Sequence, residues 1–478
     1  MRTPKILFFL LTTALVVAFV VFNFKLLFKK DISNFFPSKP KANIIIICID
    51  SLRSDHLGCY GYNRNTSPNI DEFARENILF ENNFSQSPYS LSSHVSMLSS
   101  LYPLTHRVLE VESLDLAALN KYRILSEIIS KKGFVPSLFA QGGYFTLKPL
   151  FVRGFNEVFT IKEPEIFFKK IHHWFLQKSY EKKFVFIYTS ILNPPYSYRE
   201  QAKDLYKDKD FLSREVSSAK KIISRGLNEE RFQNLSDKER SLILFYNLIE
   251  EYDPKGIAKR PLKQIMPDNW PQLDDYDRQL NCLIDSYDAN IRFLDEYLGS
   301  FFQMLKASGI WDDSLIIITS SHGQEFREHG GIAYTFELYD TILKTPLLIK
   351  LPGSEMQRSS RITQFSESVD IMPTILDIFN IDYKGPVQGV SLLPVIKGQA
   401  KKAKKAVMGF YADKRSIRTQ YYKYITCNKK DCKESRLYNL LSDPGEDNNL
   451  ISLDAPVLEG IDCLIYKHIR STQSKKAK

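Results

Sequence analysis

The sequence predicts an α/β protein with a doubly wound, mostly parallel sheet and a smaller C-terminal α+β subdomain. Residues 43–49 and 315–319 are short, largely apolar runs rich in β-branched residues, which are typical of strands buried on both faces of a parallel sheet. Strand-like and helix-like segments alternate between them, as expected for such a sheet. Asp50 follows the first run and His322 closely follows the second. Because ligands collect at the carboxyl ends of parallel strands, we expect a functional site there.

The remaining elements are expected in the following order. The first helix is predicted to begin at Pro68, with Ser67 as its N-cap. Further helices are expected at residues 92–99, 124–132 and 289–305, and further strands at residues 134–140, 184–189 and 346–349.

The chain of 478 residues is too long for one ordinary core, so we expect more than one unit. The predicted divisions are a tail (1–5), an apolar segment (6–24), a tether (25–42), a large α/β domain (43–385) and a C-terminal subdomain with a basic tail (386–478). A charged, helix-rich insertion is expected within the large domain at about 200–275.

The apolar segment Ile6–Phe24 is predicted to be an uncleaved signal-anchor. About 19 residues at 1.5 Å rise cross a bilayer core of roughly 30 Å. No small-x-small cleavage site precedes Lys25. The lysines that follow the segment outnumber the cations before it, which by itself would place the C-terminal side inside.

Composition indicates a globular protein, with 44% hydrophobic and 25% charged residues. The formal net charge is +10 and the pI is about 9.0. This balance favours anionic partners, such as sulfate or phosphate esters, acidic glycans or lipid head groups. A solvated basic surface is the alternative. No nucleic-acid-binding motif occurs, so we expect no nucleic-acid partner.

The cysteines suggest one structural bridge. Cys48 lies in a predicted buried strand and is interpreted as core. Cys427 and Cys432 flank the turn between two strand-like runs at 421–426 and 436–440. A disulfide is plausible there in an oxidising compartment. The alternative, half of a zinc site, lacks a second pair of ligands.

Several polar residues are candidates for chemistry. Ser90 precedes a short predicted helix, whose positive end favours an oxyanion, although an N-cap serine is the common structural explanation. His94 lies one turn later. His322 is followed by Glu325, Glu328 and His329, a concentration of ligand-type side chains at a strand end.

Five segments of the chain resemble the sulfatase branch of the alkaline phosphatase superfamily. They appear in the family's order, cover most of residues 43–452, and imply the alkaline phosphatase-like fold. The segments are residues 49–103, 287–331, 338–353, 418–425 and 436–450.

The resemblance implies roles for residues that match family positions. Asp50 matches the first metal-binding acid, and Ser90 matches the nucleophile. Ser321 and His322 match a metal-binding pair of acid and histidine or asparagine. The other matches, His329 and Lys423, correspond to positions that approach the anionic ester. The implied cofactor is a divalent cation, which the resemblance leaves open among Ca²⁺, Mg²⁺, Mn²⁺ and Zn²⁺.

The sequence also departs from the family pattern. In sulfatases the nucleophile lies in a C/S-x-P-x-R motif and is converted to formylglycine, but here the motif is Ser90-Leu91-Ser92-Ser93-His94. Ser51 and Ser321 stand where acids are usual. Histidines are also missing from residues 186–196 and 333–337.

Three functions therefore remain open. The first is a membrane-anchored hydrolase of sulfate or phosphate esters, with attack by Ser90, a metal held by Asp50, Ser321 and His322, and His94 assisting. The second is a catalytically impaired relative that binds an anionic glycan or lipid head group. The third is a phospho-group transferase that uses an unmodified Ser90. The resemblance implies an extracytoplasmic domain, in contrast to the charge count.

Overall fold

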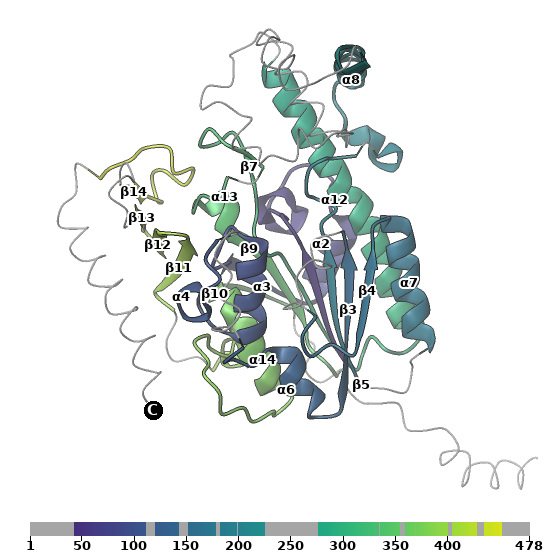
Figure 1. The fold of residues 1–478 in the computed structure, drawn as a ribbon, viewed down its shortest axis with the longest axis vertical. Helices are drawn as coiled ribbons and strands as arrows, with labels where there is room; N and C mark the ends of the chain where they lie inside the picture. Colours follow the sequence, from purple (N-terminus) through teal and green to yellow (C-terminus); the bar gives the residue numbers. More distant parts are fainter. Residues whose placement is uncertain are drawn as a thin grey trace, which may run out of the picture.

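The structure is a computed structural model (Figure 1). It describes residues 43–110, 120–142, 152–177, 182–197, 199–224, 276–333, 335–353, 359–399, 404–427 and 435–451. The predicted signal-anchor at 6–24 and the tether lie outside these ranges. Within the described ranges, no helix is both long enough and apolar enough to cross a membrane.

The central sheet has eight strands in the order β10-β2-β9-β6-β1-β5-β3-β4. Pairings are parallel except those of β9, which runs antiparallel to both β2 and β6. The mostly parallel sheet predicted from sequence is therefore confirmed, with one reversed strand. The strands are β1 (Asn43–Ile49), β2 (Ile78–Phe84), β3 (Phe134–Gln141), β4 (Glu157–Ile161), β5 (Lys182–Thr189), β6 (Ser314–Thr319), β9 (Lys344–Lys350) and β10 (Ser360–Glu367).

Helices cover both faces of this sheet (Figure 1). One layer contains α2 (Pro68–Glu76), α7 (Pro164–Gln177) and α12 (Tyr276–Ala307). The opposite layer contains α3 (Ser90–Ser99), α6 (Leu125–Ser130) and α14 (Ile371–Ile378). Shorter helices are α4 (Pro103–His106), α13 (Asp340–Leu343) and α15 (Leu393–Ile396).

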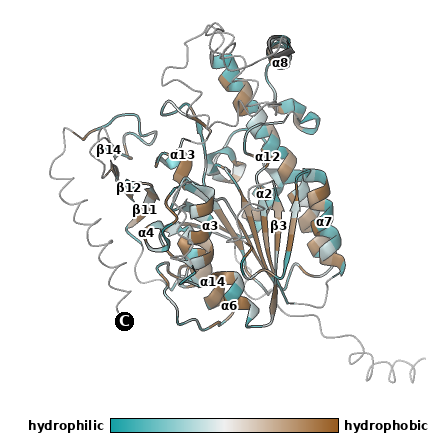
Figure 2. Ribbon diagram, viewed as in Figure 1, coloured by the Kyte–Doolittle hydropathy of each residue, from teal (hydrophilic) through white to brown (hydrophobic). Residues whose placement is uncertain are grey.

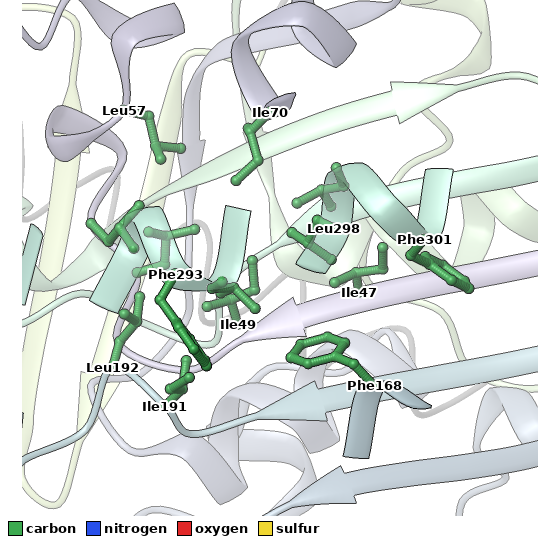
Figure 3. Close-up of a cluster of buried hydrophobic side chains, with 14 of the residues drawn as sticks. Ile47, Ile49, Leu57, Ile70, Phe168, Ile191, Leu192, Phe293, Leu298 and Phe301 are labelled. Carbon is green, nitrogen blue, oxygen red and sulfur yellow. The ribbon is translucent and has the colours of Figure 1, made fainter. Parts of the chain in front are cut away.

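The central strand β1 is buried on both sides. Its alternate side chains Ile45, Ile47 and Ile49 pack against the layer of α2, α7 and α12, whereas Ile44 and Ile46 pack against the layer of α3, α6 and α14. Figure 2 shows that the strands of the sheet are predominantly hydrophobic. Figure 3 shows the side of the sheet that faces α2, α7 and α12, where the two labelled β1 isoleucines lie among side chains from these helices and from neighbouring loops.

The first helix was predicted with Ser67 as N-cap, and Ser67 does occupy that position with Pro68 after it. Its hydroxyl does not cap the backbone, however. The Ser67 hydroxyl donates to Asp71 at 2.9 Å and accepts from the Gly58 amide at 3.0 Å. The serine therefore joins the helix to the preceding loop instead of capping its first turn.

A second, antiparallel sheet forms near the C-terminus, in the order β11-β12-β13-β14. Its strands are β11 (Ala406–Tyr411), β12 (Lys414–Thr419), β13 (Tyr422–Cys427) and β14 (Arg436–Asn439). A short pair, β7 (Glu325–Phe326) and β8 (Ile332–Ala333), follows β6. Cys427 is disulfide-bonded, and Cys432 lies outside the described residues. The predicted insertion contributes α8 (Lys209–Ser224), and its remainder from 225 to 275 is also outside them.

Candidate active site

The strand order brings the predicted site residues to one edge of the sheet. β1 lies between β5 and β6, with Cys48 paired to Tyr188 on one side and Thr319 on the other. The chain leaves β1 at Asp50, whose amide donates to the Thr189 carbonyl at 2.9 Å. His322 follows β6 by three residues, so it arrives beside Asp50 although 272 positions separate them in the sequence.

Ser90 is brought to the same point by the loop that joins β2 to α3. The loop is held from within, because the Ser93 hydroxyl donates to the Ser87 carbonyl at 2.7 Å and lies 2.8 Å from the Ser85 hydroxyl. Ser90 is the first residue of α3, and no described side chain caps this helix end. The first turn therefore presents amide groups and the positive end of the helix dipole at the Ser90 hydroxyl.

Ser90, Asp50 and His322 form a directly hydrogen-bonded group. Ser90 Oγ lies 3.1 Å from Asp50 Oδ2 and 3.0 Å from His322 Nε2. His322 Nδ1 lies 2.7 Å from the Gly323 carbonyl, which can only accept, so Nδ1 carries a proton. In the neutral ring, Nε2 is therefore the basic nitrogen and it faces the Ser90 hydroxyl. We call Asp50, Ser90, Ser321 and His322 the Asp50 centre.

Asp50 is almost fully buried, with 1% of its surface exposed. Its Oδ2 also accepts from the Tyr188 hydroxyl at 2.8 Å and from Asn193 Nδ2 at 3.0 Å, and its Oδ1 accepts from the Ser321 hydroxyl. Burial acts to raise the pKa of Asp50, but the nearby histidines and the hydrogen bonds from Ser321 and Asn193 outweigh it and lower the pKa. Asp50 is therefore an ionised carboxylate at neutral pH.

His94, predicted to assist catalysis, lies beneath Ser90 and is fully buried. Its Nδ1 bonds the Ser90 carbonyl, and its Nε2 lies 3.3 Å from Cys48 Sγ. Its ring packs edge-on against Phe186 and Tyr188. Burial lowers the pKa of His94 to about 4, so the ring is neutral at pH 7. This position favours support of the Ser90 turn over direct contact with a substrate.

Lys423, predicted to hold the ester anion, is paired with acids in this structure. Only 1% of the residue is exposed, and its Nζ lies 2.7 Å from Asp340 Oδ1 and 3.0 Å from Glu446 Oε1. Arg418 also pairs with Asp340, at 3.1 Å. We call Lys423, Arg418, Asp340 and Glu446 the Lys423 cluster. The cluster joins two cationic side chains to two carboxyl groups, of which Glu446 has its pKa raised by burial to about 7.

His329, the other predicted anion-binding residue, is likewise engaged. Its Nδ1 lies 2.7 Å from Glu325 Oε1, and its Nε2 lies 2.9 Å from the Gly445 carbonyl. Burial acts to lower the pKa of His329, but the bonds to Glu325 and Gly445 outweigh it and raise the pKa. Both partners accept hydrogen bonds, so this geometry suits an imidazolium. The remaining acid of the motif, Glu328, pairs with Arg53.

Two residues of the site, Tyr188 and Asn193, were missed by sequence reasoning. Tyr188 lies near the end of β5, and Asn193 lies in the loop that follows. The available signal was the pairing of β5 with β1, since a strand beside β1 must end beside Asp50. That neighbour relation is a property of the sheet order, which sequence periodicity does not supply.

The donor set of the Asp50 centre does not fit a divalent cation well. Asp50 is its one carboxylate, and its Oδ2 already accepts three hydrogen bonds. Ser51 and Ser321, which stand where acids are usual, supply neutral oxygens, whereas hard dications favour several charged ligands. Ser51 Oγ and Asn193 Oδ1 are buried without a hydrogen-bond partner among the described residues, but these are also neutral. Within the same residues, no group of three or more His, Cys, Asp or Glu could hold a metal ion.

Comparison with known proteins places these features in context. A family model described as Sulfatase matches residues 42–381, and one described as N-sulphoglucosamine sulphohydrolase, C-terminal, matches residues 328–475. The chain is 23% identical to an ulvan-active sulfatase of Formosa agariphila, covering 92% of this chain and 82% of that protein. It is 22% identical to an N-acetylglucosamine-6-O-sulfatase of Bacteroides thetaiotaomicron, covering 86% and 82%.

Solved structures share the fold. The phosphonate monoester hydrolase of Agrobacterium radiobacter superposes with a TM-score of 0.67 and 18% identity, covering 91% of this chain and 95% of that one. A protein in complex with its substrate D-glucosamine-2-N,6-O-disulfate superposes with a TM-score of 0.65, also at 18% identity, covering 91% and 99%. These likenesses confirm the predicted architecture.

Proposed function

The chain belongs to the sulfatase family, and we propose on this basis that it hydrolyses sulfate or phosphate esters with Ser90 as the nucleophile. The observation that carries the proposal is the position of the Ser90 hydroxyl, which lies 3.0 Å from His322 Nε2 at the N-terminus of α3. A hydroxyl beside a basic nitrogen and a helix N-terminus is arranged for nucleophilic attack on an anionic centre.

The proposed reaction has two steps. In the first, the single Ser90 proton, which Asp50 Oδ2 accepts in the resting site, moves to His322 Nε2 as Oγ bonds to sulfur or phosphorus. The ester bond to the alcohol breaks, and the leaving alcohol takes the proton back from His322. In the second, water attacks the same sulfur or phosphorus, gives its proton to His322, and the bond to Ser90 Oγ breaks. Ser90 recovers its proton, and sulfate or phosphate leaves.

The first turn of α3 would stabilise the charge on the transferring group. Its uncapped amides and the helix dipole point to the place where negative charge develops. In this scheme Asp50 fixes the Ser90 hydroxyl through Oδ2, and His94 supports the turn from below. A divalent cation held by Asp50, Ser321 and His322 would polarise the ester oxygens, but the donor set described above fits it poorly, so no step is assigned to one.

The substrate class is proposed from the relatives and the charge. The curated relatives named above act on ulvan and on N-acetylglucosamine 6-O-sulfate, as their names state. The net charge of +10 suits an anionic glycan or lipid head group. We further propose that residues 6–24 anchor the chain with its catalytic domain on the extracytoplasmic side. Membrane fractionation and protease accessibility of the intact chain test this, and protection of the domain would overturn the orientation.

The decisive experiment compares the wild type with Ser90→Ala on aryl sulfate and aryl phosphate. We expect Ser90→Ala to lose roughly 10,000-fold in kcat/KM on the hydrolysed ester, because the nucleophile is removed. Ser99→Ala is the matched control. It deletes a buried hydroxyl from the same helix that bonds only the local Val95 carbonyl, and should keep wild-type turnover. Equal rates for Ser90→Ala and wild type would overturn the proposal.

The same samples separate the alternatives. Mass spectrometry of the Ser90 peptide should show an unmodified serine, because Ser92 and His94 replace the Pro and Arg of the modification motif. A Ser90-dependent transfer of phosphate to an added alcohol, in excess of transfer to water, would favour the transferase. The absence of turnover, together with retained binding of sulfated glycan, would favour the binding protein. This is the second candidate because His329 and Lys423 are both engaged with acids.

A further inference from the structure

Asp50 is a buried charge in an unusual setting. A buried carboxylate is costly unless opposite charge or hydrogen bonds compensate it. Four side chains donate to it: Ser90, Tyr188 and Asn193 to Oδ2, and Ser321 to Oδ1. An ionised carboxyl group has about four lone-pair sites, two on each oxygen. Three donors therefore saturate Oδ2, and the Ser321 hydroxyl occupies one of the two sites on Oδ1.

The donors come from four separate parts of the fold. Ser90 is supplied by α3, Tyr188 by β5, Asn193 by the loop after β5, and Ser321 by the loop after β6. Tyr188 is fixed by the pairing of β5 with β1, which sets it opposite Cys48. The arrangement is therefore built into the sheet, and does not depend on one mobile side chain.

The two serines at acid positions, Ser51 and Ser321, differ in their hydrogen bonding. Ser321 directs its proton at Asp50 Oδ1, so its oxygen serves as a donor to the carboxylate. Ser51 lies directly after Asp50 with a φ of 60°, and its buried hydroxyl has no hydrogen-bond partner in the described part of the chain. Neither adds negative charge. A dication at this point would meet one carboxylate whose Oδ2 already accepts three hydrogen bonds, and would have to displace one of those donors to use that oxygen.

We infer that a cage of hydrogen-bond donors, formed by Tyr188, Asn193, Ser321 and Ser90, stands in place of the divalent cation at Asp50. The Asp50 centre is then assembled in the apo protein. The claim that no ion is bound does not depend on the proposed hydrolase function. The consequence that Ser90 turns over without added cation rests on that function.

The first test measures metal content and thermal stability of the full chain. Wild-type protein purified without chelator should contain only substoichiometric divalent metal by mass spectrometry. Its Tm should be the same in EDTA and in excess Ca²⁺, Mg²⁺, Mn²⁺ or Zn²⁺. A stoichiometric ion in the wild type, or a Tm that falls in EDTA and recovers with one cation, would overturn the inference.

The second test creates the missing charge. Ser321→Asp should bind one divalent cation per chain and gain roughly 3–5 °C in Tm at a cation concentration about 100 times the dissociation constant. Asn193→Asp, which is nearly isosteric and also touches Asp50, is a second route if the first variant fails to fold. Ser300→Asp adds the same charge on the exposed face of α12 and should gain nothing. If neither Ser321→Asp nor Asn193→Asp binds a cation, the cage is overturned. Positions 321 and 193 would then not lie where a cation at Asp50 could be held.

An activity assay separates this inference from the proposed function. Ser90-dependent hydrolysis that survives EDTA supports both. Ser90-dependent hydrolysis that is lost in EDTA and restored by a cation overturns the cage and leaves the hydrolase intact. Metal-free wild type with no hydrolysis of either ester overturns the hydrolase and leaves the cage intact.

Discussion

The Asp50 centre holds one carboxylate among hydroxyl and amide donors, whereas the Lys423 cluster pairs two carboxylates with two cations. Asp50 accepts hydrogen bonds from four described side chains, and His322 Nε2 lies farther off, 3.7 Å from Oδ1. Lys423 touches both Asp340 and Glu446, and Arg418 touches Asp340. The two regions therefore bury charge by different means.

This difference concerns positions to which the family resemblance gives roles in metal and anion binding. Carboxylates gather around Lys423, and are scarce where the resemblance would place a metal. Lys423, the cation expected to meet an ester anion, is paired with Asp340 and Glu446, so the anion binding that we propose at Ser90 would draw on the amides and dipole of α3. A centre held by dipoles and a cluster held by ion pairs should respond differently to mutation and pH.

The largest effect is expected in the Lys423 cluster. Lys423→Met leaves Asp340 and Glu446 buried with one cation fewer and should lower the free energy of unfolding by about 3–5 kcal/mol. Urea unfolding of the full chain measures it. The double variant Lys423→Met/Glu446→Gln removes one charge of each sign and should recover part of the loss. A single variant as stable as wild type would show that the ion pairs contribute nothing.

The pH dependence should separate the surroundings of the two regions, because His94 bonds the Ser90 carbonyl and His329 bonds the carbonyl of Gly445, next to Glu446. Burial lowers the pKa of His94 to about 4 from an ordinary value near 6.5, so between these values the unfolded chain binds a proton that the folded chain does not. The contribution of His94 to stability should therefore fall as pH drops from 6.5 to 4, by about 3 kcal/mol in total. His106, whose pKa burial lowers to about 3, acts in the same direction.

His329 should act in the opposite direction. Its pKa is raised in the folded state, so its contribution is complete below pH 6.5 and is lost as pH rises through the raised value. Unfolding measured from pH 4 to 9 checks both signs. His94→Asn should flatten the acid limb, and His329→Gln should flatten the neutral-to-alkaline limb. If either variant flattened the other's limb, the assignment of these histidines would be wrong.

Within the Asp50 centre, Asp50→Asn should cost less than Lys423→Met. The amide keeps the shape and one acceptor oxygen, but its NH₂ group meets donors where the carboxylate accepted them. We expect a loss of about 2 kcal/mol, as for a buried hydrogen-bonding group left badly paired. Urea unfolding in parallel with Lys423→Met gives the comparison. A loss larger than that of Lys423→Met would mean that Asp50 stabilises the fold through more than its hydrogen bonds.

The two regions also differ in how far they could be predicted from the sequence. The ends of β1 and β6 were predictable, because β-branched apolar runs identify buried strands and Asp50 and His322 adjoin them. The meeting of Ser90 with Asp50 followed from the family resemblance. The engagement of Lys423 was not predictable, because Asp340 lies 83 residues away and meets it only when the C-terminal sheet packs against α13. The reversal of β9 escaped prediction for a similar reason, since periodicity carries no strand direction.

The smallest predicted effect gives the most direct reading of the cage. Ser321→Ala removes one of the four donors to Asp50 and leaves three, so it should lower the free energy of unfolding by about 1 kcal/mol. The useful measurement is this loss determined twice, in EDTA and in excess Ca²⁺. A donor to a carboxylate contributes the same in both solutions, whereas a ligand to a cation contributes only when the cation is present. Equal losses therefore fit the cage, and a loss that appears only with Ca²⁺ would assign Ser321 to a metal site.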